Sequence, residues 1–168
     1  MQRRAVAQTG IEVSPLGLGT VKIGRNQGVK YPQNFELPSD KQVRDLLALA
    51  ADLGINLLDT APAYGLSEER LGKLLPGSRH QWVLETKVGE QFTDGQSSFD
   101  FTAAGTRLSV ENSLRRLKTD YLDIVLIHSN GEDERILREE AALDTLLEMK
   151  QQGWIRAVGI SSKTAAGG

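Results

Sequence analysis

The chain contains no cysteine among its 168 residues and only two histidines, His80 and His128. Without cysteine it cannot form disulfide bonds, zinc–thiolate sites or thiol nucleophiles, and its composition is compatible with a reducing compartment. No His-x-x-x-His or similar spacing joins the two histidines, so we expect no metal site. We expect His80, which follows Arg79, to be a surface residue in a turn.

An excess of charge of one sign and long apolar runs are lacking as well. The 20 basic and 22 acidic side chains give a formal net charge of −2, and they form local runs of mixed sign rather than a basic face for nucleic acid. No apolar stretch approaches the length of a membrane span, and residues 1–10 lack the apolar core of a signal peptide. The sequence therefore predicts a cytoplasmic protein whose partners are small molecules, not nucleic acid or a membrane.

A glycine-rich nucleotide-binding fingerprint is the third absence. Gly17-Leu18-Gly19 is too short to be a Gly-x-Gly-x-x-Gly signature, and no phosphate-binding loop is present. The chain is nevertheless 39% apolar, and its length is enough for one domain with a sizeable core. We expect a single domain over residues 1–168.

Segments typical of strands and of helices alternate along the chain, which is the order that builds a parallel sheet with helical crossovers. The opening stretch, Arg3–Val13, is typical of two short strands around a turn at Thr9-Gly10. The expected later strands are residues 16–19, 55–59, 82–86, 121–127 and 156–160, and the expected helices are residues 40–53, 68–75, 102–117 and 133–152. An eight-stranded barrel needs roughly 200 to 400 residues. We therefore expect an α/β fold of the parallel (β/α) TIM-barrel type with an N-terminal β-hairpin, truncated after about the fifth strand.

Helix boundaries are marked by capping residues. Ser39 followed by Gln42 is the pattern of a capping box, and Ser67 is predicted to be the N-cap of the next helix. Asp133–Gln152 is predicted to be one long helix with acidic residues in its first turns. We expect the charge cluster Glu132–Glu140 to be a solvated face of that helix.

Reactive side chains follow four successive predicted strands. Asp59, Lys87, His128 and Ser161 each lie at or just past the end of one of them. In parallel β/α barrels the active site is assembled at the carboxyl ends of the strands, so we expect these side chains to meet at one rim.

Tyr64, in the loop after Asp59, completes a set with recognisable acid–base chemistry. A tyrosine hydroxyl has a pKa of about 10, so it is a poor proton donor at neutral pH unless a neighbour stabilises its phenolate. Lys87 is placed to be that neighbour, and Asp59 to supply the counter-charge that a buried ammonium needs. With His128 to orient a carbonyl, such a set would protonate and stabilise the carbonyl oxygen as a hydride arrives. The sequence therefore predicts carbonyl reduction.

Each of these residues has a simpler interpretation when taken alone. Lys87 fits a solvated lysine, Asp59 a residue that organises a turn, and Tyr64 a packed aromatic with a satisfied hydroxyl. His128 is equally ambiguous. Their order along the chain and their shared rim favour the catalytic interpretation.

Three segments resemble motifs of the aldo-keto reductases: Asp-Thr-Ala-Pro-Ala-Tyr-Gly at residues 59–65, Glu-Thr-Lys at 85–87 and Ile-His-Ser at 127–129. Residues 16–20, 121–123 and 159–161 agree as well, so the resemblance spans the whole chain. The resemblance implies that Tyr64 is the general acid and Lys87 the modulator of its pKa. It further implies that Asp59 is the partner of Lys87 and that His128 orients the substrate.

The same resemblance implies NADPH or NADP as the cofactor. The residues expected beside it are Gly19, Thr20, Asp59, Ser161 and Ser162. The family usually has asparagine where Ser162 stands, so the amide that holds the nicotinamide carboxamide is replaced. The residues that bind the adenosine 2′-phosphate in the family belong to later strands, and none can be assigned here. We expect the long insert Val21–Pro38 to shape one side of the pocket.

The resulting hypothesis is an NAD(P)H-dependent oxidoreductase that reduces a small aldehyde or ketone to an alcohol. Two alternatives stay open. The chain could be a catalytically inactive or regulatory relative, because the cofactor-binding half is missing, or a lyase that uses Lys87 as a Schiff-base nucleophile. We also expect the unpaired edge at Arg156–Ser161 to favour self-association.

Overall fold

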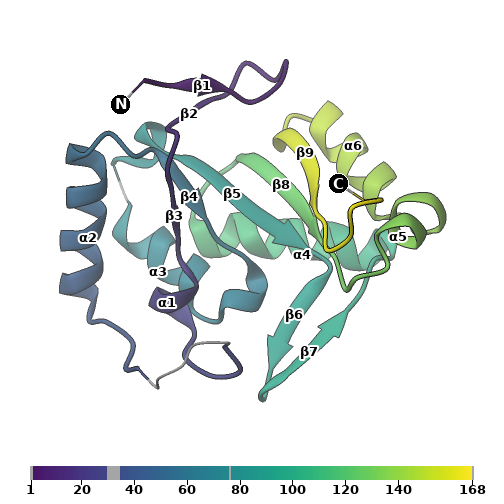
Figure 1. Ribbon diagram of the computed structural model, residues 1–168, viewed down its shortest axis with the longest axis horizontal. Helices are drawn as coiled ribbons and strands as arrows, with labels where there is room; N and C mark the ends of the chain where they lie inside the picture. Colours follow the sequence, from purple (N-terminus) through teal and green to yellow (C-terminus); the bar gives the residue numbers. More distant parts are fainter. Residues whose placement is uncertain (1, 30–34, 76, 168) are drawn as a thin grey trace.

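A five-stranded parallel sheet forms the centre of the computed structural model, which describes residues 2–29, 35–75 and 77–167. Its strands follow the order β3-β4-β5-β8-β9, and every neighbouring pair is parallel. Their bounds are β3 Gly17–Gly19, β4 Leu57–Asp59, β5 Val83–Val88, β8 Leu122–His128 and β9 Ile155–Ser161. This is the α/β fold of the TIM-barrel type that the sequence predicts. Within the described residues the sheet is open, with β3 and β9 at its edges (Figure 1).

Helices connect the strands and cover one face of the sheet (Figure 1). They are α1 Val21–Gly24, α2 Asp40–Asp52, α3 Ser67–Leu74, α4 Ala103–Leu117, α5 Asp133–Glu139 and α6 Ala142–Gln151, with short 3-10 helices at Pro62–Tyr64 and Arg79–Gln81. Alternate strand residues such as Leu58, Leu84 and Val125 are fully buried beneath them in the main core. The opposite, inner face of the sheet therefore carries the other strand residues.

The N-terminal hairpin covers one end of that inner face. Strands β1 (Arg4–Ala5) and β2 (Glu12–Val13) are antiparallel, as expected. Ile11 is 1% exposed and joins a second core cluster with Val83 and Ile124 of the inner face. Figure 1 shows this hairpin at the end of the sheet opposite to the one toward which the strands point. The hairpin does not cover the other end of the sheet, where the strands have their carboxyl termini.

One of the two predicted helix N-caps differs from the structure. The capping box of Ser39 and Gln42 is present, but Ser67 is the first residue of α3 rather than its N-cap. The Ser67 hydroxyl is instead bonded to the hydroxyls of Thr20 and Thr60, at 2.7 and 2.9 Å. A buried hydroxyl that finds side-chain partners is not available to cap its own helix.

The prediction of one long helix over 133–152 is wrong, because the helix is interrupted at Glu140, between α5 and α6. Glu140 has an extended backbone and its carboxylate is paired with Arg135. Helix α6 then begins at Ala142, with Leu146 fully buried and Leu147, the next residue around the helix, 42% exposed. Each of the two helices buries its own apolar residues, Ile136 in α5 and Ala142, Leu146 and Met149 in α6.

Asp133 corrects the expectation that the cluster 132–140 is wholly solvated. Its side chain is 1% exposed, and its oxygens accept hydrogen bonds from the backbone of Lys163 and Thr164 and from the Thr164 hydroxyl. Hydrogen bonds from the Ser129 hydroxyl and from Thr164 lower the pKa of Asp133 to about 2. The segment after β9 is therefore tied to α5. His80 is exposed, as expected.

A second hairpin was not predicted. Strands β6 (Glu90–Thr93) and β7 (Gln96–Phe99) are antiparallel and join at Asp94-Gly95, both with positive φ. Asp-Gly is a strong two-residue hairpin signal, and it was the feature that could have found this element. Figure 1 shows the hairpin extending beyond the carboxyl end of β5. It therefore borders the rim where the reactive side chains were expected.

The insert 21–38 lies partly outside the described residues, at 30–34. Its described part includes α1 and Arg25, whose guanidinium carbon lies 3.2 Å from the centroid of the Phe92 ring. Arg25 also donates to the carbonyl of Ala63, at 2.9 Å. The start of the insert is therefore packed between the second hairpin and the loop that carries Tyr64.

Candidate active site

Four strand ends bring the predicted residues to one rim. Asp59, His128 and Ser161 are the last residues of β4, β8 and β9, and Lys87 is the next to last residue of β5. Asp59 is in register with Glu85, and His128 with Ser161. Because side chains alternate between the faces of a strand, Glu85 and Lys87 share the inner face with Val83.

Lys87 is buried, with 4% of its surface exposed. Its ammonium donates to the Asp59 carboxylate and, at 3.0 Å, to the carbonyl of Thr60. Burial opposes the charged form, but Asp59, Tyr64 and Glu85 outweigh it and raise the pKa of Lys87 above its usual value. The lysine is therefore a fixed cation at neutral pH.

Tyr64 lies directly beside this cation. Its ring centroid is 4.9 Å from the Lys87 nitrogen and 6.3 Å from the His128 ring, which it meets edge to face. Burial raises the pKa of Tyr64, and the opposing effect of Lys87 offsets this only in part. The phenol is therefore protonated at neutral pH, and the lysine stabilises the phenolate that a proton transfer would leave.

Glu85 and Glu90 belong to the same group and were not singled out from the sequence. Burial, reinforced by Asp59, raises the pKa of Glu85, which lies two residues before Lys87 on the same face of β5. An oxygen of Glu90 lies 3.0 Å from Nδ1 of His128, although the ring N–H is not well aligned for a hydrogen bond. The spacing of Glu85 could have revealed it, whereas Glu90 depends on the unpredicted hairpin.

The model of the Aldo/keto reductase family matches residues 15–167. The chain belongs to this family. It is 56% identical to a putative aldo-keto reductase of Pseudomonas aeruginosa, PA4992, with a TM-score of 0.91 over 98% of this chain and 62% of that one. It is 39% identical over 166 residues to aldo-keto reductase YhdN of Bacillus subtilis, covering 96% of this chain and 47% of that protein.

Aldo-keto reductase AKR11C1 of Bacillus halodurans, in its holo form, is 35% identical, with a TM-score of 0.79 over 97% of this chain and 51% of that one. The chain spans about half the length of the curated relatives it matches.

The residues expected near the nicotinamide of an aldo-keto reductase lie on both sides of the tyrosine–lysine pair. Thr20 is buried and commits its backbone N–H and its hydroxyl to the carbonyl of Asp59, at 2.9 and 2.8 Å. A Cβ added to Gly19 would meet nothing within 4 Å, so no side chain crowds this strand end. Ser161 is half-buried and Ser162 is exposed beside His128. This arrangement fits a nicotinamide laid across the rim.

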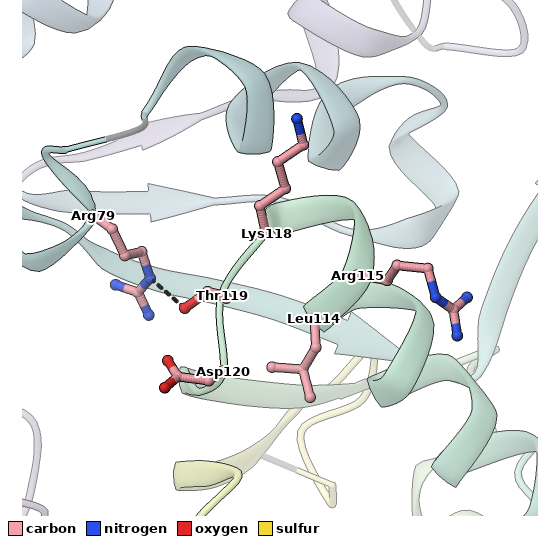
Figure 2. A pocket seen from close by; sticks show the side chains of 6 residues that line it. All are labelled: Arg79, Leu114, Arg115, Lys118, Thr119 and Asp120. Atoms are coloured by element: carbon pink, nitrogen blue, oxygen red, sulfur yellow. Dashed lines mark hydrogen bonds between the residues drawn. The ribbon is translucent and has the colours of Figure 1, made fainter.

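A hollow of about 540 Å³ lies elsewhere on this aldo-keto reductase chain and does not belong to the site. Figure 2 shows its lining, which consists of Arg79, Leu114, Arg115, Lys118, Thr119 and Asp120. Arg79 bonds to the Thr119 hydroxyl at 3.1 Å, as drawn, and to the carboxylate of Asp123 at 2.9 Å. Arg79, one of the three cations that line the hollow, is thus engaged in holding neighbouring segments together.

Among the described residues, no group of three or more His, Asp or Glu side chains is arranged to hold a metal ion. No helix in the described ranges is long and apolar enough to cross a membrane.

Proposed function

We propose that this polypeptide carries the acid–base machinery of an NAD(P)H-dependent oxidoreductase that reduces a small aldehyde or ketone to an alcohol. The observation that supports this most directly is the buried Lys87–Asp59 ion pair with the Tyr64 ring 4.9 Å from the lysine nitrogen. A lysine charge kept next to a protonated phenol is the arrangement that a neutral-pH proton donor requires.

In the proposed reaction the bound nicotinamide supplies a hydride to the carbonyl carbon. Tyr64 donates its phenolic proton to the carbonyl oxygen, and Lys87 stabilises the phenolate that remains. Asp59 holds the lysine in place and keeps it charged. His128 orients the carbonyl by a hydrogen bond from its ring.

For the cofactor we propose NADPH, with Gly19, Thr20, Asp59, Ser161 and Ser162 beside the nicotinamide. The Thr20 hydroxyl already donates to the carbonyl of Asp59 and accepts from the Ser67 hydroxyl. Thr20 therefore contributes to the cofactor site by holding Asp59 in place. Ser162 is exposed and offers a hydroxyl where the family usually offers an amide. The residues that hold the adenosine phosphates are not proposed within this chain.

The inactive or regulatory alternative stays open. Such a relative would bind a nucleotide without turnover. The lyase alternative is disfavoured by the raised pKa of Lys87, because a Schiff-base nucleophile must lose its proton. If borohydride trapped a carbonyl compound on Lys87, that result would support the lyase alternative.

The deciding experiment is calorimetric titration of the purified chain with NADPH and with NADH, with circular dichroism to confirm folding. We expect micromolar binding, followed by oxidation of the cofactor when a panel of small aldehydes and ketones is added. Tyr64→Phe should bind the cofactor as the wild type does and lose turnover. Tyr121→Phe is the matched control, because Tyr121 lies beneath Arg79 away from the rim. A folded protein that binds neither cofactor would contradict the proposal that this chain is an NAD(P)H-dependent reductase.

A further inference from the structure

Glu90, the first residue of β6, is held beside one particular nitrogen of His128. Its Oε2 lies 3.0 Å from Nδ1, and the side chains of Glu90 and His128 are 12% and 16% exposed. The Ser97 hydroxyl of β7 donates to the other oxygen, Oε1, at 2.6 Å. The carboxylate is therefore anchored within the hairpin before any substrate is present.

A neutral imidazole carries its single proton on either nitrogen, and the partners of the ring decide which. A carboxylate next to Nδ1 favours the proton there, and the close approach alone is enough for this electrostatic preference. The adjacent His128 ring, with help from the Ser97 hydroxyl, lowers the pKa of Glu90 to about 2, so the carboxylate is ionised throughout the neutral range. Glu90 thus acts on Nδ1 as a charge rather than as a neutral acceptor.

Other charged groups surround this pair, but none competes for Nδ1. Lys163, from the segment after β9, stabilises the Glu90 carboxylate from one side. Arg25, from the insert, is attracted to Glu90 from another, while its N–H groups bond to backbone carbonyls. Tyr64 meets the His128 ring edge to face. Within the described residues, Glu90 is the acidic side chain whose carboxylate approaches Nδ1 of this ring.

We infer that Glu90 is a positioning residue that keeps a proton on Nδ1 of His128 and thereby reserves Nε2 for the substrate. With Nδ1 always protonated, Nε2 donates to a carbonyl oxygen when the ring is an imidazolium. When the ring is neutral, Nε2 accepts from the hydroxyl of an alcohol. The same nitrogen, Nε2, therefore faces the substrate in both directions, as a donor in the imidazolium and as an acceptor in the neutral ring. The consequence for catalysis rests on the proposed function, whereas the protonation of Nδ1 does not.

The test is the ¹⁵N–¹H correlation spectrum of the two imidazole rings in the full chain. The chain has only two histidines, so exposed His80 provides an internal reference for His128. We expect the wild-type spectrum to show His128 with its proton on Nδ1. A wild-type ring protonated on Nε2 alone would overturn the inference without recourse to any variant.

Glu90→Gln removes the charge at nearly constant shape. Because a neutral amide attracts the Nδ1 proton less than a carboxylate 3.0 Å away does, we expect the ratio of Nδ1–H to Nε2–H forms to fall about tenfold. Asp94→Asn is the matched control: it removes one charge from the same hairpin at an exposed turn whose positive φ asparagine accepts. An unchanged ratio in Glu90→Gln, equal to that of Asp94→Asn, would contradict the assignment.

Turnover separates this inference from the proposed function. If the chain reduces carbonyls, Glu90→Gln should lower kcat/KM for the carbonyl about tenfold while the Kd for NADPH stays unchanged. If the chain reduces none, the proposed function fails, and the ring-nitrogen spectra still decide the role of Glu90.

Discussion

Tyr64 and Lys87 are the pair on which the chemistry depends, and their coupling can be measured directly. Burial raises the pKa of Tyr64 while Lys87 lowers it. Lys87→Met removes the opposing charge, so we expect the pKa of Tyr64 to rise further and turnover to fall by about two to four orders of magnitude. Ultraviolet titration of the phenolate, with Tyr64→Phe to identify the signal, checks the first effect.

A pKa of Tyr64 that is the same in Lys87→Met would show that the lysine does not act on the phenol. Lys41→Met, at an exposed ion pair on α2, is the control and should change neither quantity.

The pH dependence of stability provides a second prediction at the residue scale. Glu90 has its pKa lowered to about 2 in the folded chain, from an ordinary value of 4.5. A carboxyl whose folded pKa is depressed stabilises the fold above its unfolded pKa, and this contribution is lost as the pH falls toward the folded value. We therefore expect the difference in unfolding free energy between wild type and Glu90→Gln to shrink between about pH 4.5 and pH 2. Urea denaturation across this range measures it, and a difference that grows toward low pH would contradict the ion pair.

At this scale the sequence predicted Asp59, Lys87 and His128 correctly as strand-end residues, because an apolar run followed by a polar residue marks where a buried strand ends. Their catalytic roles stay predictions. Glu90 could not be predicted, since its contact with His128 requires β5 and β8 to be neighbours in the sheet and the chain after Val88 to continue into the second hairpin. Contacts of that kind depend on tertiary geometry, for which the local pattern has no signal.

Among the elements, the junction of β5, β8 and β9 depends on one buried carboxylate. Asp123 is 1% exposed and accepts from the backbone N–H of Leu84 at 3.0 Å, from Arg79 at 2.9 Å and from Arg156 at 2.6 Å. Asp123→Asn leaves two guanidinium groups without their counter-charge. We expect it to destabilise the fold by about 3 kcal/mol, measured by urea denaturation.

The control for this change is Asp45→Asn, which removes a carboxylate from an exposed i, i+4 pair with Lys41. Exposed pairs contribute little, so the loss should stay below about 0.5 kcal/mol. Equal losses in the two variants would mean that burial of Asp123 is not what makes its ion pairs matter.

The elements also show where periodicity is informative and where it is not. The apolar spacing of α2 is regular, and its helix matches the prediction closely, with Val43, Leu47 and Ala50 buried. The stretch 133–152 has enough apolar residues for one continuous stripe, yet the paired Glu140 interrupts it. A break stabilised by an ion pair changes the phase of a helix without changing its composition, so the sequence pattern does not reveal it.

The sheet is open over the part of the chain that the structure describes, and its two edges are the basis of a proposal about association. Strand β9 ends the sheet on one side, and β3 ends it on the other with α2 alongside (Figure 1). Open edges are templates for pairing with a further strand. Helix α2 adds apolar surface at its edge, where Leu49 and Leu53 are each 55% exposed. We propose that a second copy of the chain covers such an edge.

The expected outcome is a species larger than the 18.4 kDa chain in sedimentation velocity, with a proportion that rises with concentration. The double variant Leu49→Lys, Leu53→Lys places two charges on the edge helix and should shift the population toward monomer by roughly tenfold or more, since each lysine would have to be desolvated in the interface. Leu108→Lys is the matched control, because Leu108 is equally exposed, at 54%, on α4, which lies behind the middle of the sheet rather than at an edge. A wild-type chain that sediments as a monomer at all concentrations would refute the association. Equal effects of the two substitutions would show that apolar exposure in general, and not the open edge, drives it.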